Sequence, residues 1–168
     1  MDSKFSKNDM VVYGNNGICT VEDIRIMKFG KDEAVYYVLK PKASSAATLY
    51  VPQDKESLVS KMRKLLTREE IDNILHSDVK KLSWPENRLE RADLFGEILS
   101  RCNTGELLMM IKCIHLKRNE KLSQGKSLSA SDENFLRVAE KLINEEFSFC
   151  LGCTDDEVKE YIKTKMNN

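Results

Sequence analysis

The chain has 168 residues, of which 41% are hydrophobic and 32% are charged, and it contains only 3 Pro and 7 Gly. This composition excludes a fibrous or disordered protein and is typical of a helix-rich globular protein with room for one medium domain or two small ones. Lys plus Arg and Asp plus Glu both total 27, so a surface that binds a polyanion requires local segregation of charge.

Strand-forming residues dominate up to about residue 52. Apolar, β-branched and aromatic residues gather in four runs, at 10–13, 18–27, 34–40 and 48–51. Residues that favour turns separate these runs at 14–17, 29–32 and 43–46. Four or five short strands without an intervening helix predict a small, strongly bent antiparallel sheet or barrel.

From about residue 53 the apolar period becomes that of helices. Four capping patterns place Ser or Thr three positions before an acid, which predicts helix starts at Thr67, Ser83, Ser129 and Thr154. A fifth helix is predicted from about Thr104, while Gly125 and Gly152 stand where helices should end. We therefore expect an α+β protein with a β-domain at 1–55 and a bundle of about five helices at 56–168.

The sequence predicts a cytoplasmic protein whose cysteines are reduced. The first ten residues lack a signal-peptide core and no later run is long enough to span a bilayer, so we expect a cytoplasmic protein. We expect free thiols rather than disulfides at the five cysteines, which are Cys19, Cys102, Cys113, Cys150 and Cys153.

Candidates for catalysis or metal binding are few. Cys150 and Cys153 have the spacing of redox and zinc motifs, but further ligands at a matching spacing are lacking, and His76 and His115 are far apart in sequence. We therefore expect no catalytic residue, no metal site and no cofactor, and hence no enzyme. A thiol-redox or zinc protein built on Cys150 and Cys153 is kept as an alternative.

Basic residues form two groups that could neutralise phosphates. Five cations stand between positions 112 and 126 against the single acid Glu120, and a second group surrounds the only tryptophan, Trp84. The alternative for both groups is a solvated helix face. Trp84 precedes Pro85 at a predicted helix start, so it either packs into the bundle or forms an aromatic wedge against the minor groove.

Several motifs in succession resemble one family. At the N-terminal end they are 5–17, 36–39 and 50–52, and at the C-terminal end they are 97–99, 104–107, 116–118 and 125–142. Together they resemble the CarD transcription regulators, whose N-terminal module is shared with the transcription-repair coupling factor. The chain departs from the family at Met27 and Tyr50, where arginine is frequent, which puts the usual polymerase contacts in doubt.

The resemblance implies a Tudor-like module that binds the RNA polymerase β subunit and a helical domain that contacts promoter DNA without reading its sequence. It assigns Trp84 to the upstream edge of the melted region, and we expect the protein to modulate open-complex stability. The expected DNA-binding residues are Trp84, Lys80, Lys81, Arg88, Arg91, Lys117, Arg118 and Lys121. The expected polymerase-binding residues are Arg25, Met27, Lys28, Lys40 and Tyr50. We expect no membrane partner and no small-molecule substrate, and an adaptor that never touches DNA is the alternative function.

Overall fold

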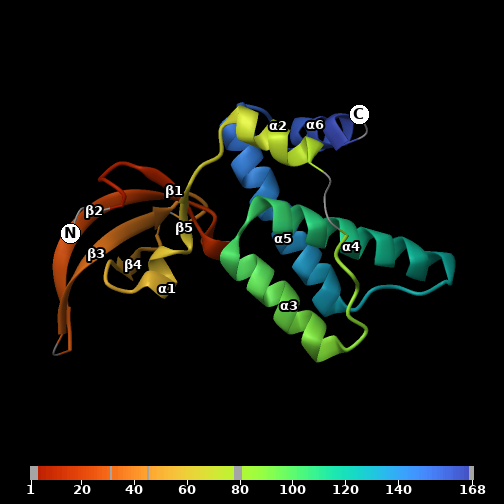
Figure 1. Ribbon diagram of the computed structural model, residues 1–168, viewed down its shortest axis with the longest axis horizontal. Helices are drawn as coiled ribbons and strands as arrows, with labels where there is room; N and C mark the ends of the chain where they lie inside the picture. The colour runs from red at the N-terminus through yellow and green to blue at the C-terminus, as the bar shows by residue number, and fades with distance from the viewer. Residues whose placement is uncertain (1–3, 31, 45, 78–80, 167–168) are drawn as a thin grey trace. The chain divides into compact units, whose positions relative to one another are not determined.

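The computed structural model describes residues 4–30, 32–44, 46–77 and 81–166, and the chain divides into two compact units, Met1–Leu65 and Leu66–Asn168 (Figure 1). The first unit is a sheet with one short helix and the second is helical. The α+β fold class is therefore confirmed. The units divide after residue 65 rather than after residue 55, because residues 56–65 contribute a helix and a further strand to the sheet unit.

The first unit is built on five antiparallel strands in the order β4-β3-β2-β1-β5. Their bounds are β1 Met10–Tyr13, β2 Ile18–Phe29, β3 Asp32–Pro41, β4 Leu49–Pro52 and β5 Met62–Lys64. The 3₁₀ turn Gly14–Asn16 joins β1 to β2, and the short helix α1, Glu56–Val59, lies between β4 and β5. In Figure 1 the paired β2 and β3 form a long, curved hairpin.

The pleat of the strands separates a core face from an opposite face. Cross-strand partners share a face of the sheet, and two such pairs, Val11 with Cys19 and Tyr37 with Val51, belong to the buried core cluster. Met62 from β5 completes this cluster from the far edge. Burial of these alternating side chains fixes the strand register, because a slip of one residue would expose them.

The residues of the second unit that the structure describes, 66–77 and 81–166, form five helices: α2 Arg68–His76, α3 Arg88–Arg101, α4 Thr104–Ser123, α5 Ala130–Leu151 and α6 Asp155–Met166. The predicted caps at Thr67, Ser129 and Thr154 are present, and Thr67 forms a complete capping box with Glu70. Gly152 has a positive φ of 67° at the end of α5, which is a conformation that favours glycine.

The helical core is formed by apolar side chains from all five helices. Its buried members include Ile71 of α2, Phe95 of α3, Met110 of α4, Phe147 of α5 and Val158 of α6. The pair α2 and α6 and the trio α3, α4 and α5 each pack closely, as Figure 1 shows. Within the part of the chain that is described, none of the helices combines the length and the hydropathy that a membrane span requires.

Candidate functional site

The segment before α3 determines where Trp84 lies. We expected Ser83 to cap this helix, and that prediction is wrong. Asn87 is the N-cap, and its side-chain oxygen accepts hydrogen bonds from the backbone N–H groups of Leu89 and Glu90 at 2.8 and 3.4 Å. Trp84 therefore lies in a non-helical segment that leads into α3, rather than on the first turn of the helix.

The indole of Trp84 is half-buried and contacts both apolar and cationic groups. Its ring meets the buried ring of Phe95 edge to face, with 5.9 Å between centroids and 67° between planes. The guanidinium of Arg91 lies 4.5 Å from the indole centroid, and the ammonium of Lys117 lies 5.9 Å from it. Trp84 thus packs on the bundle while part of its surface stays accessible and is bordered by positive charge.

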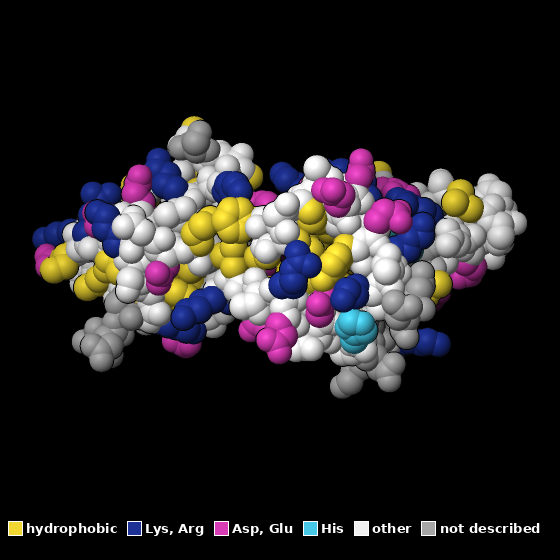
Figure 2. All heavy atoms as spheres, turned by 90° about the horizontal axis from the view of Figure 1, so that it is seen from above, with side chains coloured by type: hydrophobic (Ala, Val, Ile, Leu, Met, Phe, Trp, Pro, Cys, Tyr) yellow, Lys and Arg dark blue, Asp and Glu magenta, His cyan; other side chains and the backbone are white. Residues whose placement is uncertain are grey.

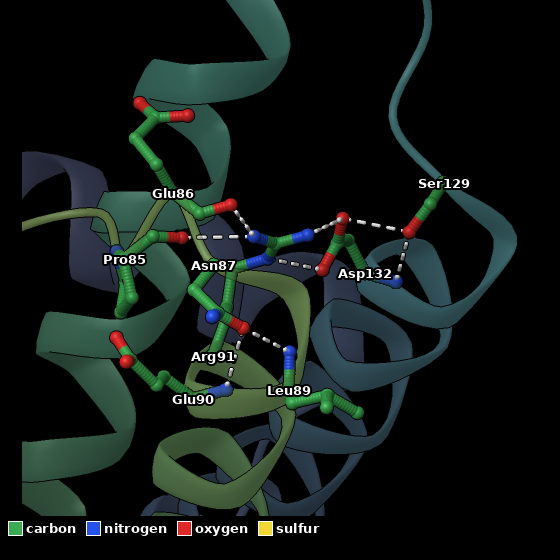
Figure 3. Close-up of polar contacts among 8 residues, drawn as sticks. All are labelled: Pro85, Glu86, Asn87, Leu89, Glu90, Arg91, Ser129 and Asp132. Carbon is green, nitrogen blue, oxygen red and sulfur yellow. Dashed lines mark hydrogen bonds and ion pairs between the residues drawn. The ribbon is translucent and has the colours of Figure 1, made fainter.

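Arg91 links α5 to the backbone of Pro85 and Glu86 (Figure 3), the two residues that follow Trp84 in the chain. Its Nε donates to Asp132 Oδ1 at 2.9 Å and its Nη2 donates to Oδ2 at 3.2 Å, while Nη1 donates to the carbonyls of Pro85 at 2.8 Å and Glu86 at 3.3 Å. The side chains of Arg91 and Asp132 are only 9% and 5% exposed. These contacts give Arg91 a positioning role in place of the phosphate contact that we expected.

Asp132 is itself fixed at the start of α5. The Ser129 hydroxyl donates to Asp132 Oδ2 at 2.7 Å and accepts from the Asp132 N–H at 3.2 Å. Burial disfavours ionisation of this carboxyl, but the hydrogen bonds from Arg91 and Ser129 and the charges of Arg91 and Lys121 outweigh it, so its pKa is lowered. Asp132 is therefore a buried carboxylate that is paired at neutral pH.

Two further expected DNA contacts on α4 are compensated by acids. Lys117 Nζ donates to Glu86 Oε1 at 3.2 Å and to Glu120 Oε1 at 3.4 Å. The hydrogen bond to Glu86 contributes most to a raised pKa of Lys117, which keeps this ammonium charged. Arg118 forms a bidentate pair with Glu133. A phosphate would have to compete with these carboxylates.

The other expected DNA-binding cations differ in exposure. Lys81 and Arg88 are exposed, Lys121 is half-buried, and Lys80 lies outside the described residues. On the face drawn in Figure 2, Lys and Arg side chains are interspersed with Asp and Glu rather than gathered in one broad positive patch. The charge around Trp84 itself is mixed, because Arg91 and Lys117 beside its ring pair with Asp132, Glu86 and Glu120.

The expected polymerase-binding residues fall on two faces of the sheet. Arg25 is the cross-strand partner of Tyr36, and Tyr50 is the partner of Val38, so both side chains lie on the face opposite the core cluster. Met27 and Lys40 share that face by the two-residue period of their strands, whereas Lys28 lies on the other. Arg25, Lys28 and Tyr50 are exposed, and Met27 and Lys40 are half-buried.

An aromatic cluster on this outer face escaped the sequence reasoning. Phe29 is 52% exposed and Tyr50 is 42% exposed. The Phe29 ring lies 5.2 Å from the Tyr36 ring and 6.1 Å from the Tyr50 ring. Phe29 was predicted from the sequence to lie in a turn. The two-residue period of a strand, which puts Arg25 and Met27 on one face, could have placed Phe29 on that face as well.

In the described part of the chain, the cysteines and histidines are not joined by further side chains into a metal site. The five cysteines are thiols rather than disulfides, and Cys150 and Cys153 are half-buried. His76 Nδ1 contacts the carbonyl of Asp72, and His115 Nε2 contacts a carboxylate oxygen of Glu140 at 2.9 Å. No group of three or more His, Cys, Asp or Glu side chains within the described ranges is arranged to hold a metal ion.

Asp132 is the other residue of the site that the sequence reasoning did not identify. Its place in the Ser129 capping pattern was recognised, but only as part of a helix start. The sequence did contain a signal. The residue three positions after the N-cap in a capping pattern is usually Glu, whereas position 132 is Asp, whose shorter side chain keeps the carboxylate close to the start of the helix. Its partner stands 41 positions earlier in the chain, so the pair itself could not be inferred.

Comparison with known proteins assigns the sheet unit. Residues 5–65 match the family of CarD-like/TRCF RID domains. This range ends at the boundary of the first compact unit, Leu65. No curated protein matches the chain. The RID family is an RNA polymerase-interaction domain rather than a catalytic one, and RNA polymerase is therefore the partner that this domain indicates. Residues 5–65 therefore form a CarD-like RNA polymerase-interaction domain.

Proposed function

We propose that this protein is a transcription regulator that is held on RNA polymerase by its sheet unit and touches promoter DNA through Trp84. The sheet unit binds the β subunit of the polymerase. The indole lies at the upstream edge of the melted DNA and changes the stability of the open complex. Contacts to phosphates and a single wedge carry little sequence information, so the regulator acts on DNA shape rather than on a motif.

The half-exposed, cation-flanked indole is the observation that carries this proposal. Aromatic and apolar wedges that enter the minor groove hold a distorted duplex, and cations beside them neutralise the flanking phosphates. Trp84 supplies the aromatic ring, because it lies outside a helix and is only half-buried. The cations near it in sequence that are exposed and could reach phosphates are Lys81 and Arg88. The buried pair of Arg91 with Asp132 keeps this segment in one conformation, so that little entropy is lost when DNA binds.

The acids around the indole make tethering to polymerase necessary. Asp132 already pairs with Arg91, and Glu86 and Glu120 already pair with Lys117. Arg91 and Lys117 are the cations over the indole, so the helical unit alone should bind DNA weakly. A tether converts the second contact into an intramolecular one, with an effective concentration on the order of millimolar for a short linker. DNA contact thus acts only after polymerase has recruited the protein.

The DNA contact is tested by replacing Trp84 with Ala and with Phe and by measuring the lifetime of open complexes formed with the polymerase of the same organism. Stacking of an aromatic ring on a base is worth about 1–3 kcal/mol, so Trp84→Ala should change the lifetime by at least about fivefold. Trp84→Phe should retain most of the effect, because it keeps an apolar ring.

Stability and polymerase binding are the controls for this experiment. Loss of about half of an indole surface of about 200 Å² from the protein interior costs roughly 2.5 kcal/mol, so circular dichroism should still show a folded chain. If Trp84→Ala keeps its polymerase binding and leaves the lifetime at the wild-type value, the adaptor without DNA contact is the correct function.

The face of the sheet that contacts polymerase is tested by reversing the charge of two exposed residues, one on each face. Arg25→Glu alters the outer face beside Tyr36, whereas Lys28→Glu alters the opposite face of the same hairpin. Lys28 was expected to bind polymerase with Arg25 and Tyr50, but it lies on the opposite face of the sheet from both, and we propose that the contact excludes it. We therefore expect Arg25→Glu to weaken capture of the polymerase β subunit and Lys28→Glu to leave it close to wild type. The reverse order, or equal effects, would place the polymerase contact elsewhere on the sheet unit.

A further inference from the structure

A cavity of about 850 Å³ lies among α4, α5 and α6, and Trp84 is not among the residues that line it. Its apolar lining comes from all three helices: Leu108 and Ile111 of α4, Ile143 of α5 and Ile162 of α6. Leu108 and Ile143 are buried, while Ile111 and Ile162 are half-buried. The volume falls within the range of roughly 300–1,000 Å³ that is typical of small-molecule sites.

Positive side chains surround this apolar lining. Lys112, Lys159 and Lys163 also line the cavity and all three are exposed. Lys159 pairs with Asp156 at 3.2 Å and Lys163 pairs with Glu160 at 3.8 Å. Their side chains and those of both partners are at least 63% exposed. Exposed pairs of this kind contribute little, so these ammonium groups can turn to a ligand at small cost.

One acidic side chain lines the cavity, and it has a partner. Glu140 Oε1 lies 2.9 Å from His115 Nε2, and both residues line the cavity. Three ammonium groups therefore face one carboxylate that is already hydrogen-bonded. Because opposite charges attract across such a rim, the charge balance favours a ligand with a negative group.

We propose that this cavity binds a small organic anion with an apolar body, such as a carboxylate or sulfonate on an alkyl chain or an aromatic ring. The apolar part fills the space between Ile111, Ile143 and Ile162, and the anionic group lies among the lysines at the rim. A phosphate backbone has no apolar part to cover these isoleucines, and therefore it does not fit the site. This binding is independent of the contacts proposed for polymerase and promoter DNA.

The test is a fluorescence titration of the full chain with 8-anilinonaphthalene-1-sulfonate, an aromatic sulfonate that brightens in apolar surroundings. We expect saturable binding at one site and displacement by decanoate. Acetate, which has the charge without the apolar body, should not displace the probe. Decyltrimethylammonium, which has the apolar body and the opposite charge, should displace it at least about tenfold less well than decanoate.

Substitutions locate the site. Lys112→Glu and Lys163→Glu change exposed residues, so both variants should fold, and each should weaken probe binding by about tenfold or less, with a larger loss when they are combined. Lys141→Glu is the matched control, because this exposed lysine of α5 does not line the cavity. Ile162→Trp should exclude the probe by filling the space while it keeps the charges.

Three results would overturn the proposal. The first is equal displacement by the cationic and anionic amphiphiles, since it would show that charge plays no part. The second is probe binding that Lys112→Glu, Lys163→Glu and Ile162→Trp leave unchanged, since the probe would then bind elsewhere. The third is the absence of saturable binding to the folded chain. None of these results would bear on Trp84 or the polymerase interaction.

Discussion

Replacing Asp132 by Asn removes the negative charge from the buried pair with almost no change in shape. Arg91 would then keep a buried positive charge, with its side chain 9% exposed, and would lose its bidentate carboxylate partner. Breaking a buried pair from one side costs about 3–5 kcal/mol. With a urea dependence of about 2 kcal/mol per molar, the unfolding midpoint should fall by roughly 2 M.

The only tryptophan provides the assay. Trp84 lies in the helical unit and packs on Phe95, so its fluorescence during urea unfolding reports on that unit. Asp156→Asn is the matched control, since Asp156 pairs with Lys159 at 94% exposure and should cost less than about 1 kcal/mol. Equal, small effects of the two substitutions would refute the assigned role of the Arg91–Asp132 pair.

The remaining predictions concern caps, pH and salt. Thr67→Ala should lower the free energy of unfolding by about 1 kcal/mol, whereas Ser83→Ala should change it by less than about 0.5 kcal/mol; a larger loss at Ser83 would contradict the observed helix start. The pKa of Asp132 is lowered on folding, so its stabilising effect is present above the ordinary value of 3.8 and is lost as pH falls below it. The gap in unfolding free energy between the wild type and Asp132→Asn should therefore narrow in acid, and a constant gap would argue against a paired carboxylate. Substituting Gln for the exposed Arg88 should reduce the salt dependence of promoter binding by about one unit of slope if this residue contacts a phosphate, and Lys81→Gln should act alike.

Local signals predicted the helices better than they predicted helix starts. The Thr67 and Ser129 patterns were sufficient because no rival pattern stands beside them. At α3 the pattern from Ser83 to Glu86 competed with a second one from Asn87 to Glu90, and the structure uses the second.

The fifth strand could not be foreseen, although four or five strands were expected. Met62–Lys64 has only three residues and follows a helical turn, so neither its period nor its length distinguishes it from the helices that surround it in sequence. It becomes a strand by pairing with β1, about fifty positions earlier. Pairing over such a separation is decided by packing in three dimensions and leaves little trace in local sequence.

For the candidate site, the sequence identified the residue types but not their partners. Trp84 and the nearby cations were found, whereas the structure shows which cations are already bound to carboxylates. Arg91 and Arg88 look alike in sequence, three positions apart, yet one is buried against Asp132 and the other is exposed. Whether Arg88 or Arg91 is buried depends on which face of α3 packs inward. That face was not identified from the sequence, because the start of α3 was predicted at Ser83 instead of Asn87.

The fork of hydrogen bonds made by Arg91 has an evolutionary consequence. Lysine has the same charge, but its single ammonium cannot span both oxygens of Asp132 and two carbonyls in this planar geometry. Among natural relatives of this chain, arginine at position 91 and aspartate at position 132 should therefore be inherited together or replaced together. Position 88, where the side chain is exposed, should drift freely between arginine and lysine.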